Sequence, residues 1–159
     1  MGLGVFGKIV TRRSRAREIA LQVLFQEDLN PQSSPEEGEA LLRRRLKQPD
    51  LVEFSRDLVA GVRQYRSELD RRIEQTAAHW SLHRMAATDR NVLRLGAYEI
   101  LYCGTPGRVA INEAVELAKR YGAAHSPQFV NGILDRLMHE AAAREEGLGA
   151  RDEGLGIGN

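Results

Sequence analysis

Apolar residues recur every three or four positions through most of the chain, which is the spacing of one face of an α-helix. The first such stripe predicts a helix from about 13 to 29, ending before Asn30-Pro31. A second stripe runs from Leu51 to Ile73, and Ser67 is placed to begin a separate helix after a bend in it. Three heptads are too few to favour a coiled coil, so these segments are predicted to be packed core helices.

Polar residues mark where several helices begin. Ser34 is predicted to be an N-cap, with Pro35 in the first helical position and Glu37 completing a capping box. Thr88 is expected to cap a later helix that carries Asp89 in its first turn and Gly96 on its buried face. Gly122 ends the next helix, and Ser126-Pro127 begins the last one.

The stretch QFVNGIL combines a hairpin signal with a helical pattern. Asn131-Gly132 suits a type I′ turn, but the flanking apolar residues come in pairs and do not alternate, which favours a helix. Gly132 is then predicted to mark the close approach of another helix, with Asn131 bonding across that contact. The chain is therefore predicted to be all-α, with six or seven helices.

Composition describes a single globular domain. Of 159 residues, 42% are hydrophobic and 28% charged, and no apolar run approaches the ~18 residues of a membrane span. The N-terminus does not resemble a signal peptide. A lone Cys103, expected to be a small buried hydrophobe, excludes an internal disulfide and suits the cytoplasm. We expect a flexible segment over 1–11, a domain over 12–146, and a disordered glycine-rich tail over 147–159.

Positive charge gathers near the N-terminus. Residues 8–26 hold five cations against Glu18, a net charge of +4 in a chain of net charge +1. Such cations disfavour a helix N-terminus, so a bound polyanion explains them better than a solvated helix start does, although the latter stays open. If four RNA phosphates are neutralised, the logarithm of the binding constant should fall with the logarithm of the salt concentration at a slope of about −3. Alanine at Arg12, Arg13, Arg15 and Arg17 is predicted to flatten that slope and to leave stability nearly unchanged.

The sequence offers little catalytic chemistry. His79 and His83 are four residues apart, but without further ligands they are better read as surface residues than as a metal site. No phosphate loop, nucleophile elbow or Cys/His pair is present. Tyr121 and Phe129 flank the turn GAAHSP, where aromatic rings and the free N–H groups of a helix start suit single-stranded RNA. Phe129 serves equally well as a core residue.

Three stretches, RSRAREIALQVLFQEDL, DRNVLRLGAYEIL and VAINEAVELAKRYG followed by SPQFVNGILDRL, resemble the NusB family of transcription antitermination factors. The resemblance covers roughly residues 12–138. It implies two packed helical subdomains without catalysis, cofactor or metal. It also implies binding to the boxA element of ribosomal RNA leader transcripts together with a small-subunit ribosomal protein, NusE, so that RNA polymerase reads through terminators.

The resemblance also implies roles for particular residues. Positions matching the family's RNA contacts are Arg12, Arg13, Arg15, Arg17, Arg94, Tyr121, Gln128 and Phe129. Phe25 and Asp89 fall near its contacts with the ribosomal protein. The sequence departs from the family pattern at Ala124 to Gln128, which lacks an acidic pair and a lysine next to the expected RNA site.

Two alternatives to the antitermination function stay open at this point. One is a helical protein–protein adaptor with weakened RNA binding, which the altered loop favours. The other is the N-terminal domain of a ribosomal RNA cytosine methyltransferase, which the glycine-rich tail after residue 146 disfavours. A homodimer is compatible with the sequence as well.

Overall fold

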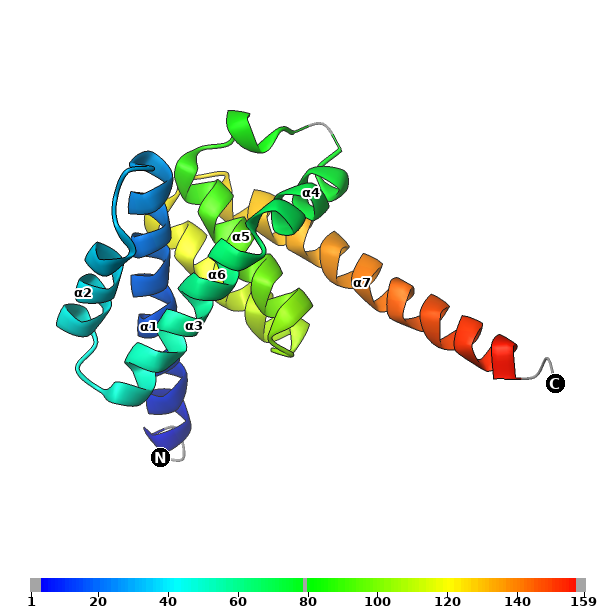
Figure 1. The fold of residues 1–159 in the computed structure, drawn as a ribbon, viewed down its shortest axis with the longest axis horizontal. Helices are drawn as coiled ribbons and strands as arrows, with labels where there is room; N and C mark the ends of the chain where they lie inside the picture. Colours follow the sequence, from blue (N-terminus) through cyan, green and yellow to red (C-terminus); the bar gives the residue numbers. More distant parts are fainter. Residues whose placement is uncertain (1–3, 79, 157–159) are drawn as a thin grey trace.

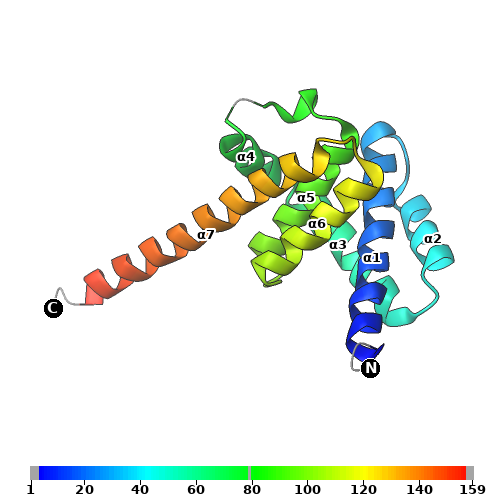
Figure 2. The ribbon, with the colours of Figure 1, turned by 180° about the vertical axis from the view of Figure 1, so that it is seen from behind.

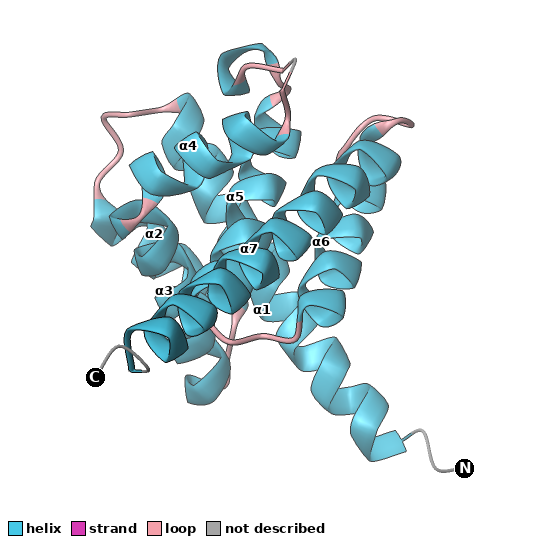
Figure 3. Cartoon of the chain, turned by 90° about the vertical axis from the view of Figure 1, so that its right-hand side faces the viewer, coloured by secondary structure: helices cyan, strands magenta, loops and turns pink. Residues whose placement is uncertain are grey.

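The computed structural model describes the backbone of residues 4–78 and 80–156 and the side chains within 12–78 and 80–148. This part of the chain forms seven α-helices and one short 3₁₀ helix, with loops between them and no strand (Figure 3). The all-α prediction and its upper count of seven helices are confirmed.

The N-terminal subdomain consists of three helices. These are α1 (Gly4–Leu29), α2 (Pro35–Arg45) and α3 (Pro49–Gln64). Helix α1 packs against both of the others, with α2 on its outer side (Figure 1). Its middle is buried on almost every side: Ala16, Ile19 and Ala20 have no exposed surface. A helix so enclosed can hold a charged side chain only where a partner neutralises it.

The C-terminal subdomain is built around α5 (Ala87–Tyr102). It also contains α4 (Arg66–Thr76), the 3₁₀ helix η1 (Leu82–Arg84), α6 (Gly107–Tyr121) and α7 (Ser126–Gly156). Helix α5 packs against α4, α6 and α7 on one side and against α1 and α3 on the other, so it joins the two subdomains (Figures 1 and 2). Its side chains Val92, Leu93 and Ala97 are fully buried.

Helix starts differ in detail from the sequence prediction. Ser34 precedes α2 in extended conformation, but its side chain makes no capping hydrogen bond, so the predicted capping box does not form. Helix α4 begins after Tyr65 and not at Ser67, and α5 begins after Ala86, which places Thr88 inside the first turn. Neither Tyr65 nor Ala86 makes a side-chain capping hydrogen bond, so both helices start without the cap that the sequence predicts.

Both terminal helices are longer than predicted. Helix α1 begins at Gly4, before the predicted start at about 13, and α7 continues to Gly156, while flexibility of 1–11 and disorder of 147–159 stay predictions. The reason is that extending an existing helix fixes one residue for each hydrogen bond gained, while starting one is costly. Figures 1 and 2 show α7 leaving the body of the molecule well before it ends. Residues 1–3 and 157–159 lie outside the described residues.

The prediction for Gly132 was wrong. Space is open around it, since no atom beyond its chain neighbours and the backbone of its own helix turn lies within 4 Å of where its Cβ would be, and Asn131 is exposed. The close approach occurs instead at Gly96 of α5, where a Cβ would lie 2.6 Å from Leu134 Cδ1 of α7. Gly61 of α3 is equally constrained, because the ring of Tyr98 occupies the position of its Cβ.

These two environments predict opposite effects of alanine. Gly132→Ala should raise the free energy of unfolding by about 0.5–1 kcal/mol, because alanine loses less backbone entropy in an open helical position. Gly61→Ala should lower it by about 1–3 kcal/mol or more, because Tyr98 must move. Urea denaturation followed by circular dichroism measures both, and equal effects would contradict the packing described here.

Two further expectations concern single residues. Cys103 is exposed at the end of α5, so the prediction of a buried hydrophobe was wrong. The apolar stripe of α5 ends before it, which leaves the thiol beyond the core. His83 is exposed, and His79 lies outside the described residues. Among described residues no helix is long and apolar enough to cross a membrane, and no cluster of three or more metal-ligating side chains occurs.

Candidate nucleic-acid interface

Three of the arginines predicted to contact RNA lie at the surface of α1. Arg13 is exposed, and the side chains of Arg12 and Arg15 are each 42% exposed. Arg12 Nη2 donates to Asp50 Oδ2 at 3.1 Å and also to Gln48, so α1 is tied to the start of α3. The Arg13 guanidinium lies 5.0 Å from the ring centre of Phe54. All three keep donors that a phosphate can reach.

Arg17 is an internal residue. It is 4% exposed, and its Nε and Nη2 donate to both carboxylate oxygens of Glu99 on α5 at 2.8–3.1 Å. Glu99 also accepts from the Thr105 hydroxyl at 3.3 Å, and the Arg17 guanidinium stacks over Phe54 at 5.2 Å. The pair joins the two subdomains. The RNA contact of Arg17 stays a prediction, and a phosphate would have to displace Glu99 to reach this guanidinium.

Arg94 is also internal, and its RNA contact likewise stays a prediction. It is 4% exposed and donates from Nε and Nη2 to Asp70 of α4 at 2.7 and 3.0 Å. Asp28 of α1 lies 3.6 Å from Arg94 Nη1 and is bound by Arg90 as well. Burial opposes ionisation of Asp28, but hydrogen bonds from Arg90 and Asn91 and the charges of both arginines outweigh it and lower its pKa. Arg94 therefore helps to hold α1, α4 and α5 together.

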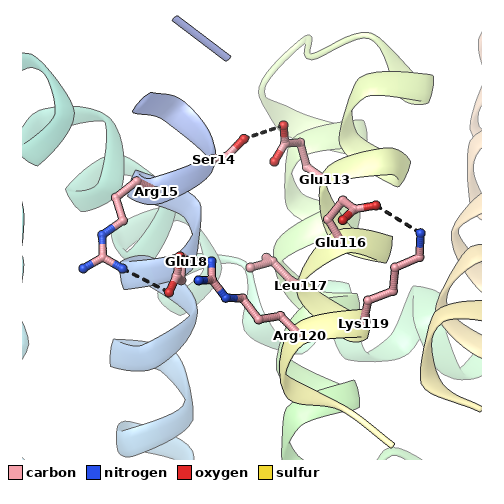
Figure 4. A pocket seen from close by; sticks show the side chains of 8 residues that line it. All are labelled: Ser14, Arg15, Glu18, Glu113, Glu116, Leu117, Lys119 and Arg120. Carbon is pink, nitrogen blue, oxygen red and sulfur yellow. Dashed lines mark hydrogen bonds and ion pairs between the residues drawn. The ribbon is translucent and has the colours of Figure 1, made fainter. Parts of the chain in front are cut away.

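A charged groove of about 680 Å³ runs between α1 and α6 (Figure 4). Its centre is Glu18, which is 6% exposed and accepts from Arg15 Nη1 and from Arg120 Nη1, both at 3.0 Å. The hydroxyl of Tyr121 donates to the same carboxylate. At the other end, the Ser14 hydroxyl donates to Glu113 at 2.8 Å. Glu18 thus holds two guanidiniums in fixed positions at the rim of the groove.

A second, more apolar groove of about 460 Å³ adjoins the first. It is lined by Leu21, Gln22, Phe25, Gln26, Thr88 and Tyr121. Tyr121 is 39% exposed, and burial together with its hydrogen bond to Glu18 raises the pKa of its hydroxyl. The structure therefore brings Phe25, expected to meet a protein partner, together with Tyr121, expected to meet RNA.

Asp89, the other residue expected to contact the protein partner, follows Thr88 of this apolar groove in sequence. It is 3% exposed, and its Oδ1 is buried without a hydrogen-bond partner in the part of the chain that the structure describes. A buried acceptor without a donor costs free energy. A donor supplied from outside the chain would remove that cost.

The turn between α6 and α7 carries the remaining predicted residues. Gln128 is exposed and Phe129 is half-buried. Two of the N–H groups expected to be free are engaged, because Ser126 donates to Ala123 O at 3.0 Å and Phe129 to His125 O at 3.1 Å. The turn therefore offers side chains more than backbone donors.

Trp80 is the residue that sequence reasoning missed. It lies in the loop between α4 and η1, is 54% exposed, and its ring meets Phe129 edge to face with 5.6 Å between centroids. The His125 ring lies on the same Phe129 at 6.5 Å. A sequence signal did exist, because the only tryptophan falls between two helices and outside every apolar stripe. We call Trp80, His125 and Phe129 the aromatic corner.

Comparisons with known proteins agree on one family. The profile described as "NusB family" matches residues 14–139. The transcription antitermination protein NusB of Bdellovibrio bacteriovorus is 42% identical over 130 residues, covering 80% of this chain and 96% of that protein. The NusB protein of Desulfatibacillum aliphaticivorans is 44% identical over 137 residues, covering 85% and 94% of the two chains.

Solved structures give the same result. NusB from T. maritima superposes with a TM-score of 0.75 at 38% identity, covering 84% of this chain and 94% of that one. A second match is a crystal structure of the antitermination factors NusB and NusE in complex with double-stranded RNA. It has a TM-score of 0.73 at 30% identity and covers 82% of this chain and 98% of the matched one.

Proposed function

Because this chain belongs to the NusB family, we propose that it is a transcription antitermination factor that binds RNA together with a ribosomal protein of the NusE type. The observation that carries this proposal is the match over nearly all of a chain found in complex with NusE and RNA. At the finer level, the RNA is the boxA element of ribosomal leader transcripts, read as a single strand. The protein helps RNA polymerase pass terminators, in the cytoplasm and without catalysis or a cofactor.

Attraction to RNA comes from the surface arginines of α1. Arg12, Arg13 and Arg15 lie within four residues of one another and are accessible, and Arg120 faces the same groove as Arg15. Arg15 and Arg120 are already ordered by Glu18, so less side-chain freedom is lost when a phosphate binds. Arg17 and Arg94 support the fold beneath this surface and are left out of the RNA contacts.

Recognition of bases falls to the aromatic corner. Single-stranded RNA is bound through unstacked bases placed on aromatic planes. Trp80 and Phe129 meet edge to face, which leaves ring surface of the exposed tryptophan free for such a base. The apolar groove beside α1 suits the protein partner, because Leu21 and Phe25 line it. Asp89 follows Thr88 of its lining in sequence, and its buried Oδ1 has no hydrogen-bond partner among the described residues.

Fluorescence-anisotropy binding to a boxA-type single strand tests this function. A scrambled strand and a duplex of the same boxA sequence serve as controls, each with and without the cognate NusE-type protein. We expect tighter binding to the boxA strand, enhanced by the partner, and loss of the enhancement in Phe25→Ala. No discrimination even with the partner present would favour the helical adaptor, and preference for the duplex would overturn single-strand recognition.

The salt dependence of binding should report the three surface arginines. Replacing Arg12, Arg13 and Arg15 by glutamine removes about three phosphate contacts, so the slope of log K against log salt should become shallower by about 2. The slope is measured by anisotropy at several salt concentrations. Arg17→Gln should instead reduce stability without a comparable change of this slope. An unchanged slope in the triple variant would show that Arg12, Arg13 and Arg15 do not contact phosphates.

A further inference from the structure

A third hollow, also of about 460 Å³, lies where α2 is followed by α3. Its lining is Arg43, Leu46, Lys47, Pro49, Val52, Glu53 and Arg56, and we call it the corner groove. Three cations and one carboxylate face it. Helix α2 contributes one wall and α3 the other, so cations distant in sequence are brought to one place.

Two guanidiniums of the corner groove are held in position by one carboxylate. Glu39 accepts from Arg43 Nε at 3.0 Å and from Arg56 Nε at 3.0 Å. The side chain of Arg43 is nevertheless 70% exposed and that of Arg56 41%. Arg43 thus keeps both terminal NH₂ groups free of this bond, so an oxygen ligand can be bound while the internal contact persists.

The rim of the corner groove carries cations that the fold leaves unused. Arg44, Arg45 and Lys47 are exposed and make no hydrogen bond or ion pair with another described residue. Cations in the last turn of α2 interact favourably with the helix dipole. That explanation does not extend to Lys47, which follows the helix, or to Arg56, which belongs to α3.

The corner groove is continuous with the arginines of α1. Arg12 bonds to Gln48 and Asp50, which flank Pro49 of the groove lining at the start of α3. The connection between α2 and α3 passes beside the N-terminal half of α1 in both Figures 1 and 2. Around this junction lie six cations (Arg12, Arg43, Arg44, Arg45, Lys47 and Arg56) and four carboxylates (Glu39, Asp50, Glu53 and Asp57), a local charge of +2.

We propose that the corner groove and its rim bind the sugar–phosphate backbone of RNA that flanks the recognised element. The proposal rests on the proposed function and extends it to a second, sequence-independent contact. A lipid surface fits poorly, because Leu46 is 3% exposed and Val52 is half-buried, so the groove presents little apolar surface among its charges. An acidic protein fits less well than RNA, because protein interfaces usually need an exposed apolar centre, which the groove lacks.

Three RNAs distinguish this contact from the proposed contact with the boxA element. They are the boxA element alone, the boxA element with a single-stranded tail, and the tail alone. The variant carries Arg44→Gln, Arg45→Gln and Lys47→Gln. A control of equal charge change carries Arg71→Gln, Arg108→Gln and Arg144→Gln, which lie on other helices. Binding is followed by anisotropy at 50 and 200 mM salt, and thermal unfolding of each variant is recorded separately.

We expect the variant to bind the element alone as the wild type does and to lose affinity for the tailed RNA. Lowering the salt concentration from 200 to 50 mM increases the affinity for the tailed RNA. Removal of about three phosphate contacts should make that increase about 20-fold smaller. Equal behaviour of variant and control, or equal losses on short and tailed RNA, would overturn the proposal. If wild type does not distinguish the element from a scrambled strand, the proposed function fails. In that case binding of the tail alone tests the corner groove. If the variant binds the tail as tightly as the wild type does, the proposal for the corner groove is overturned.

Discussion

Replacing Arg17 by alanine should lower the free energy of unfolding by about 3–5 kcal/mol, because Glu99 would remain buried without its partner. For a chain of this size such a loss corresponds to a melting temperature lower by about 6–20 °C. Urea denaturation and thermal unfolding followed by circular dichroism measure it. This expectation replaces the one made from the sequence, in which all four arginines could be changed at little cost to stability.

Two further variants show whether the buried charge is responsible. Arg15→Ala is the matched control on the same helix, because its side chain is 42% exposed, and it should cost about 0–1 kcal/mol. Arg17→Met combined with Glu99→Leu removes both charges and should recover much of the loss. Failure of the double variant to recover would show that packing against Phe54, and not the charge, governs the effect.

Removing the aromatic corner should have the largest effect on RNA binding. Each base–aromatic stack contributes about 1–3 kcal/mol, so Trp80→Ala alone should weaken binding of boxA-type RNA by about 5–150-fold. Its stability should change little, since more than half of the side chain is exposed. Anisotropy measures the affinity. Quenching of the single tryptophan of the wild-type protein on RNA addition provides an independent signal.

Phe129 needs a variant that separates stacking from packing. Phe129→Leu keeps an apolar side chain against the core but removes the aromatic plane, so it should weaken RNA binding with a smaller loss of stability than Phe129→Ala. Arg136→Ala, an exposed change on the same helix, is the control. Unchanged RNA affinity in both Trp80→Ala and Phe129→Leu would exclude stacking at this corner.

The apolar spacing was sufficient to predict the fold class, because a helix places every third or fourth residue on one face whatever its neighbours are. It was not sufficient to locate helix starts. Ser67 and Thr88 have the right chemistry for caps, yet α4 begins at Arg66 and α5 at Ala87, after Tyr65 and Ala86, which make no side-chain cap. Gly132 and Gly96 look alike in sequence, and only the position of α7 decides which one is crowded.

The candidate site was predictable only in part, for a similar reason. The sequence does not show whether an arginine is exposed or buried, because Glu99, the partner of buried Arg17, lies 82 residues away in the chain. The same holds for Arg94 and Asp70. Trp80 was overlooked because it belongs to no periodic stripe, although binding residues are found disproportionately on loops that a rigid scaffold positions.

The carboxylate of Glu18 has a thermodynamic consequence. It joins Arg15, which faces the charged groove, to Tyr121, which lines the apolar one. A ligand that moves Arg15 or Tyr121 therefore also moves the other side chain through Glu18. Binding of RNA at one groove would then change the affinity of the other groove for the protein partner. Linkage is reciprocal: the factor by which the partner tightens RNA binding equals the factor by which RNA tightens partner binding. Glu18→Gln should then reduce both factors together, leaving two nearly independent binding equilibria.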